Sequence, residues 1–372
     1  MKIKLNSSFF KMAYCLYYFT FFLEDLPLEN TLNVDLLQIA SYIRYFTYTI
    51  FILHLISQKL PLKNLVLLIC IVLGGVLVAI GTSSFYWMIL PIVILSATNE
   101  NIFSVIKLSY RLLLILTIVV VVLSALEILP DILSYRTPFS PPRHSLGFYH
   151  SNVLPMVIFW LLSYKMILSS ETEKISWFEL VFWFVLTLTV NYLCDSRNGI
   201  FSVLLLLILY IIAKNKNSGT KFNTVLFWSS KYSTLVCIVF SFIAMFFQET
   251  KTSFWLLINS LSSGRFSAAY NQLKISGINL INLSPIEINY ILDNGYLCVA
   301  FTFGIVFVFF YVITAFKLSK RYRNNLIVLI VSCIAAIVNI IDNDLTSYGY
   351  LPIILLAFHS KNLFGKVQTK ET

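Results

Sequence analysis

The stretch LLLILTIVVVVLSAL, Leu112–Leu126, decides the fold class because it contains no charged side chain over its whole length. A helix needs about 20 predominantly apolar residues to cross the hydrocarbon core of a bilayer, and this stretch is the centre of such a segment. The sequence therefore predicts an all-α, polytopic transmembrane helical bundle of about 12 spans, with residues 1–372 forming a single integral membrane domain. The predicted spans are approximately 5–23, 35–57, 64–81, 83–97, 106–126, 151–169, 176–193, 199–213, 227–248, 295–316, 324–341 and 347–360.

Composition supports this class. Of the 372 residues, 58% are hydrophobic and only 12% are charged, whereas soluble domains carry roughly 25% charged residues. A soluble enzyme, a disordered chain and a disulfide-rich secreted module are therefore excluded. The net charge of +10 does not indicate a nucleic-acid partner, because the basic residues are scattered between apolar runs instead of gathered on one face.

The distribution of charge predicts the orientation. Lys and Arg near helix ends stay on the cytoplasmic side, and a cytoplasmic N-terminus followed by 12 spans places 20 of the 27 basic residues inside. The same arrangement places 12 of the 17 acidic residues outside. No cleavage site follows the first apolar stretch, so it is predicted to be a retained helix and not a signal peptide. We therefore expect a multi-pass protein with both termini in the cytoplasm.

Two long external loops are predicted at residues 127–150 and 249–294. The second contains the apolar patches Ser253–Leu261 and Asn279–Leu283, which favour short interfacial helices over a free loop.

Three external arginines lie beside Gly or Ser: Arg143 in PPRHSLGFYHSN, Arg197 in CDSRNGI and Arg265 in SSGRFSAAYN. A guanidinium binds phosphate in bidentate fashion and stays charged, and small neighbours allow a ligand to approach closely. A single arginine of this kind is commonly a lipid headgroup anchor. Three on one membrane face favour a site for an anionic ligand.

Three further residues are candidates with a structural alternative. His150 has an ordinary pKa near 6.5, which suits acid–base chemistry, and it lies close to Arg143 and Asn152; an interfacial histidine can equally be a satisfied polar residue. Asp293 in LDNG could form a helix cap. Arg44 lies inside a span, roughly 13 Å from its outer end, where a charge is usually functional but could also reach outward to the interface.

Several kinds of site are not indicated. The sequence lacks Walker A, HExxH, GxSxG and CxxC motifs, and its six cysteines are spread mainly through the spans. With four histidines and no clustered carboxylates, neither a metal nor another cofactor is predicted.

The stretches RxSLGFxHxN (Arg143–Asn152), SRNG (Ser196–Gly199) and SGRF…DNGYL…FGI (residues 263–305), with the large outer loop late in the chain, resemble the Wzy-type polysaccharide polymerases. The residues in these motifs resemble the Gram-positive branch of this O-antigen polymerase/ligase superfamily. The likeness runs in order from roughly residue 130 to 310 and departs at Ser151, where Pro is expected.

The resemblance implies a glycosyltransferase of the bacterial cytoplasmic membrane. It would transfer a glycan from undecaprenyl pyrophosphate to a sugar hydroxyl of another lipid-linked repeat unit, outside the membrane. Implied partners are the lipid-linked oligosaccharide, membrane lipid, and a chain-length regulator and flippase of the same pathway. Pyrophosphate is itself a good leaving group, so the lack of nucleotide motifs fits this chemistry.

Residue roles follow from the same resemblance. Arg143, Arg197 and Arg265 would contact pyrophosphate or acceptor, with Arg44 as a further substrate-binding residue. His150 is the first candidate for the base or for the group that orients the acceptor, followed by Asp293 and then Asp195; Asn152 would position His150 or a sugar hydroxyl.

Two alternatives stay open. A ligase of the same superfamily would carry the same motifs. A flippase or transporter of lipid-linked sugar would bind near the bilayer midplane, whereas here only Arg44 lies well inside a span.

Overall fold

The computed structural model of the chain describes residues 2–27, 36–58, 62–82, 84–136, 140–170, 175–215, 220–250, 252–284 and 286–359. Within them the regular structure is helical, apart from one isolated pair of residues joined as in an antiparallel sheet. The α-helices are α1 (Lys2–Phe22), α2 (Leu36–Ser57), α3 (Leu62–Thr82), α4 (Tyr86–Ser96), α5 (Ile102–Ala125), α6 (Val153–Ser169), α7 (Trp177–Cys194), α8 (Arg197–Asn215), α9 (Thr220–Phe246), α10 (Ser253–Leu261), α11 (Arg265–Ser276), α12 (Gly295–Thr302), α13 (Ile305–Arg321), α14 (Leu326–Val338) and α15 (Leu351–Phe358).

Every predicted span overlaps helix in the structure. Five helices are long and apolar enough to cross a membrane: Gln38–Ser57, Ile102–Ala125, Trp177–Cys194, Arg197–Lys214 and Lys221–Thr250. Four others are apolar but shorter, namely Ile71–Thr82, Tyr86–Asn99, Val153–Ser169 and Leu326–Val338. The expected end of the last span at residue 360, and the C-terminal residues after it, lie outside the described residues.

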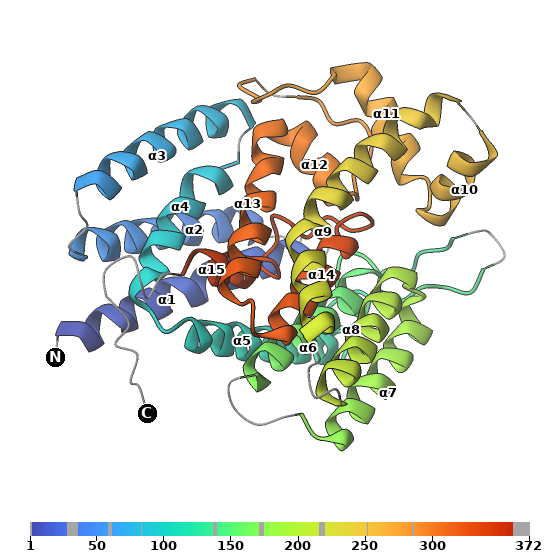
Figure 1. The fold of residues 1–372 in the computed structure, drawn as a ribbon, viewed down its shortest axis with the longest axis horizontal. Coiled ribbons are helices and arrows are strands. Elements are labelled where there is room, and N and C mark those ends of the chain that lie inside the picture. Colours follow the sequence, from blue (N-terminus) through green and yellow to red (C-terminus); the bar gives the residue numbers. More distant parts are fainter. Residues whose placement is uncertain are drawn as a thin grey trace.

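The centre of the molecule is formed by α6, α14 and α15, which are buried on nearly every side. In Figure 1, α14 and α15 lie in the middle of the ribbon, with α1–α4 to one side and α7 and α8 to the other. The peripheral helices α2, α3, α5 and α7 instead expose large apolar side chains along one face. An apolar stripe of this kind is typical of helices that contact lipid.

The predicted tenth span, 295–316, is wrong as one continuous helix, because it breaks at Gly304 into α12 and α13. Gly304 has φ +111°, which only glycine adopts without strain. The N–H groups of Ile305 and Val306, freed by the break, donate to the carbonyls of Asn279 and Leu280 at 3.1 and 3.2 Å. Non-helical backbone at membrane depth is tolerated where protein satisfies it in this way.

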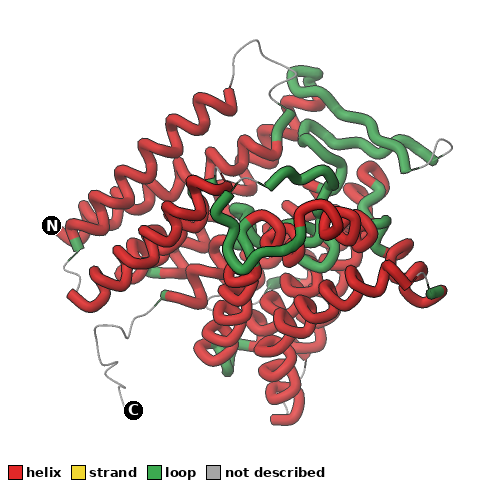
Figure 2. The backbone as a smooth tube through the Cα atoms, turned by 90° about the horizontal axis from the view of Figure 1, so that it is seen from above, coloured by secondary structure: helices red, strands yellow, loops and turns green. Residues whose placement is uncertain are grey.

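This break also explains a second correction. Ser253–Leu261 forms a short helix as predicted, namely α10, but Asn279–Leu283 is not helical. Its backbone runs beside the break at Gly304, where the Asn282 N–H donates to the Phe303 carbonyl at 3.0 Å. Its polar groups therefore complete the broken helix instead of forming a helix of their own. Figure 2 shows the longer loops gathered toward one part of the molecule.

Gly304→Ala is expected to destabilise the protein by at least about 2 kcal/mol, since it combines backbone strain with overpacking. An added Cβ would lie 2.4 Å from the carbonyl oxygen of Leu280. The matched control is Gly74→Ala in α3, where nothing lies within 4 Å of the added carbon. Thermal unfolding of the detergent-solubilised proteins measures both, and equal melting temperatures would contradict the prediction.

Candidate functional site

The loop after α5 holds Arg143 in place from both sides. Ser134 and Arg143 exchange two backbone hydrogen bonds, of 3.1 and 2.9 Å. The carboxylate of Asp131 accepts from the N–H groups of Ser145 and Leu146 at 2.8 and 2.9 Å. These contacts fix the chain direction on either side of the arginine, so its side chain enters the protein at a defined place.

The side chain of Arg143 joins this loop to two helices. Its Nε donates to the carbonyl of Cys194 at the end of α7 at 3.1 Å, and an Nη atom donates to Oδ1 of Asn152 at 2.7 Å. The backbone N–H of Asn152 donates to Nδ1 of His150 at 3.1 Å. Asn152 therefore connects the arginine to the histidine directly before α6 begins.

A close contact between α6 and α8 brings the SRNG stretch to the same place. A Cβ on Gly199 would lie 2.2 Å from Cβ of Pro155, so only glycine lets the first turn of α8 approach α6 this closely. Arg197 and Asn198 thereby lie beside the start of α6, with Arg197 exposed and Asn198 buried.

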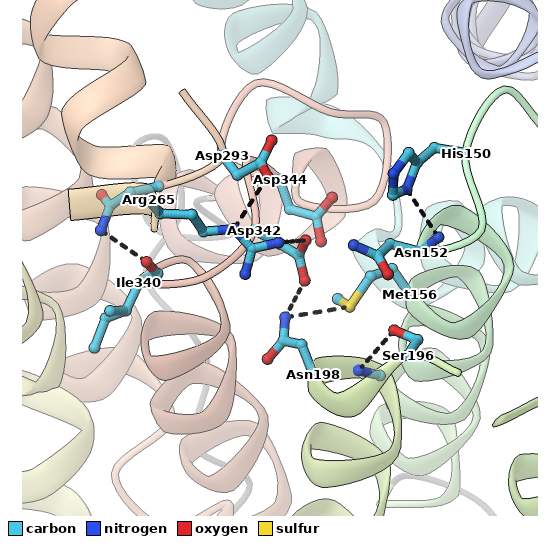
Figure 3. A network of polar contacts seen from close by, with 12 residues as sticks. His150, Asn152, Met156, Ser196, Asn198, Arg265, Asp293, Ile340, Asp342 and Asp344 are labelled. Carbon is cyan, nitrogen blue, oxygen red and sulfur yellow. Dashed lines mark hydrogen bonds and ion pairs between the residues drawn. The ribbon is translucent and has the colours of Figure 1, made fainter. Parts of the chain in front are cut away.

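The opposite side comes from α11, the segment that leads to α12, and the loop between α14 and α15. Arg265, the first residue of α11, donates through Nε to Asp293 at 3.0 Å and lies 3.9 Å from Asp342. Asn198 donates to the carboxylate of Asp342, which links this side to α8 (Figure 3). Asn294, next to Asp293, is the residue that caps α12 by accepting from the Leu297 N–H at 3.0 Å.

Burial changes the protonation of the two acids in this last loop. It raises the pKa of Asp342 to about 6, although the Arg265 guanidinium opposes the change. Burial, followed by the negative charge of Asp342, raises the pKa of Asp344 to about 8. The protonated form is therefore favoured more strongly at Asp344 than at Asp342, which pairs with Arg265.

Together these segments enclose a cavity of about 860 Å³. Six of the eight site residues predicted from the sequence line it, although they come from four separate stretches of the chain. The lining residues are Arg136, Arg143, His150, Asn152, Arg197, Asn198, Phe201, Ser260, Leu261, Ser263, Arg265, Asp293 and Ile341.

The cavity is strongly cationic. Four guanidinium groups and one carboxylate line it. Two of the arginines are paired with acids, Arg136 with Asp195 at 2.6 Å and Arg265 with Asp293. Arg143 and Arg197 form no ion pair with any residue that the structure describes. Arg143 and Arg197 therefore have no carboxylate partner among these residues, which favours an anionic ligand.

The contacts of His150 decide which hydrogen bonds it can make. Desolvation and then the positive charge of Arg143 lower its pKa below the usual 6.5, so the ring is neutral at pH 7. Because an N–H donates to Nδ1, the proton of the neutral ring lies on Nε2. His150 therefore presents a hydrogen-bond donor to the cavity, and Asp293 is the better placed group to accept a proton.

Arg44 is not part of this cavity. It forms an ion pair with Glu24 at 2.6 Å, and its guanidinium lies 4.4 Å from the ring centre of Phe21. Phe21 lies in the last turn of α1, and Glu24 directly follows this helix. Together with these two residues, Arg44 lines a separate cavity. The resemblance gave Arg44 as a further substrate-binding residue, and the structure places it in a different cavity from the other arginines, because α2 packs against α1 and α4.

Three residues of the site were not among the sequence candidates. Arg136 lies in the same loop as Arg143, and Asn198 directly follows Arg197. Closeness in sequence to a predicted site arginine could therefore have identified both residues. Asp342 is one of two acids in the short DND stretch between α14 and α15. Asp195, the weakest candidate for the base, is engaged by Arg136.

Among the described residues, no group of three or more His, Cys, Asp or Glu side chains is placed to hold a metal ion. What the cavity binds must therefore be inferred from its own side chains. Comparison with models of protein families, with curated proteins and with solved structures finds no match to this chain.

Proposed function

We propose that the protein is a polysaccharide polymerase that joins lipid-linked oligosaccharide repeat units on the outer side of the bacterial cytoplasmic membrane. The observation that carries this proposal is the cavity lined by four arginines beside a carboxylate and a histidine. A pyrophosphate group carries the negative charge that Arg143 and Arg197, which have no carboxylate partner among the described residues, favour. Five helices are long and apolar enough to cross a membrane, which suits an enzyme whose lipid-linked substrate is anchored there.

The proposed chemistry assigns a role to each side of the cavity. A hydroxyl oxygen of the acceptor sugar attacks the anomeric carbon of the donor, and the bond from that carbon to the pyrophosphate oxygen breaks. The leaving pyrophosphate takes the electron pair and is stabilised by Arg143, Arg197 and Arg265. The hydroxyl proton passes to the carboxylate of Asp293, while His150 donates through Nε2 to a pyrophosphate oxygen. Pre-aimed donors of this kind are worth about 2.7–4 kcal/mol each.

Deletion of the gene tests the proposal. Single repeat units linked to undecaprenyl pyrophosphate are expected to accumulate on the outer face of the membrane, and long polymer is expected to disappear. Intact cells are treated with an added glycosidase. Lipid-linked units that are cleaved lie on the outer face, and units that are protected lie on the cytoplasmic face. Units retained on the cytoplasmic face would identify a flippase, and long lipid-linked polymer that is not passed on would identify a ligase.

A further inference from the structure

The second cavity, which contains Arg44, has a different chemical character. Its volume is about 430 Å³, within the range of small-ligand pockets. Its charged side chains are Arg44, Glu24 and Asp25, and Arg44 is already paired with Glu24. This cavity therefore has no excess positive charge with which to bind phosphate.

Its walls combine aromatic rings with neutral polar groups. Tyr45 and Phe85 pack edge to face with ring centres 5.6 Å apart, and both are exposed. Asn343, Thr346 and Ser347 supply an amide and two hydroxyl groups from the loop between α14 and α15. Aromatic faces beside amides, hydroxyls and a carboxylate are suited to a sugar, which has apolar C–H faces and an edge of hydroxyls.

Two short segments form a wall shared by both cavities. Ile341 lines the arginine cavity and Asn343 lines the second one, and two residues span at most about 7 Å. On the other side, His150 lines the arginine cavity while the N–H of its neighbour Tyr149 donates to the carbonyl of Asp25 at 2.7 Å. The two cavities are therefore adjacent, with residues 341–343 and the segment of Tyr149 and His150 between them.

We propose that this second cavity binds the terminal sugars of the acceptor repeat unit. The inference rests on the proposed polymerase function and adds a separate acceptor site. The donor glycan lengthens with every cycle, so a cavity of about 430 Å³ cannot hold the whole of it. The acceptor presents the same terminal sugars each time, and these fit a cavity of fixed size. Tyr45 and Glu24 are the residues that contact them.

Binding measurements with two probes test the proposal on the purified full-length protein in detergent. The first probe is the free repeat-unit oligosaccharide, released by mild acid from the lipid-linked units of a deletion strain. The second is inorganic pyrophosphate. Tyr45→Ala and Glu24→Gln are expected to weaken oligosaccharide binding at least about 10-fold and to leave pyrophosphate binding unchanged. Arg265→Ala is expected to do the reverse.

The control is Tyr42→Ala, which removes an exposed tyrosine from the same helix, α2, outside the cavity; it should change neither affinity. The acceptor site is overturned if oligosaccharide does not bind the wild type, or if its binding survives Tyr45→Ala and Glu24→Gln and is lost in Arg265→Ala. Unchanged pyrophosphate binding in Arg265→Ala would instead count against the proposed function, so the two failures are distinguishable.

A kinetic measurement separates acceptor from donor. The free oligosaccharide has no pyrophosphate, so it can only accept a glycan, and the wild type is expected to extend it. Tyr45→Ala should raise the KM for this acceptor about 10-fold with little change in kcat. A raised KM for the lipid-linked donor in its place would overturn the assignment.

Discussion

Arg265→Ala is expected to reduce polymerisation by about 10³-fold or more, which leaves single repeat units at the cell surface. Loss of one pre-aimed donor commonly costs about 10²–10³ in rate. This variant also removes the partner of Asp293 at 3.0 Å and of Asp342 at 3.9 Å. Two carboxylates then face the incoming pyrophosphate without a guanidinium between them, and their repulsion adds to the loss.

The measurement is the length distribution of glycan from a deletion strain that carries each variant. Lys274→Ala is the matched control, because Lys274 is a basic residue of the same helix, α11, and its ammonium lies over the ring of Tyr270 at 4.4 Å instead of in the cavity. Arg143 is a less sharp target, since it is buried and ties the loop to Cys194. A normal glycan chain length in Arg265→Ala would contradict the proposed role of the cavity.

Asp293→Asn is expected to lower the rate of glycan transfer by about 10³-fold, within the range for loss of a general base. The amide keeps the shape of the side chain and can still accept from Nε of Arg265, but it cannot take the acceptor proton. Binding of pyrophosphate should therefore persist while turnover is lost. Release of undecaprenyl pyrophosphate from purified protein and lipid-linked substrate measures this step.

Two comparisons sharpen this test. Glu287→Gln neutralises an exposed acid in the same segment between α11 and α12, outside the cavity, and should leave turnover unchanged. His150→Gln keeps an N–H donor, so it should retain more activity than Asp293→Asn. If His150→Gln loses as much as Asp293→Asn, the base is His150 and the proton assignment drawn from Asn152 is wrong.

The sequence predicted the helical segments because each depends on a local run of apolar side chains, as Leu112–Leu126 shows. It did not reveal the break at Gly304, because the reason for that break lies about 25 residues earlier, in the backbone of Asn279 and Leu280. An apolar run reports the preference of a segment for lipid or protein interior. It does not report whether another segment satisfies the hydrogen bonds of an interrupted helix.

The part of the candidate site that residue type indicates could be predicted from the sequence. Arginines beside small residues on one predicted face identified Arg143, Arg197 and Arg265, and all three line one cavity. That Arg44 lines a different cavity could not be predicted, because depth in a span does not show which helices are neighbours. The proton on His150 was also out of reach, since it depends on a single backbone N–H from Asn152.

The shared wall between the two cavities constrains how such a protein can diversify. A substitution in 341–343 alters the surroundings of both cavities, so under the proposed function a change there endangers transfer itself. Tyr45 and Phe85 line the second cavity and not the arginine cavity. New glycan specificities can therefore arise by drift at α2 and at the start of α4 while the chemistry is inherited unaltered.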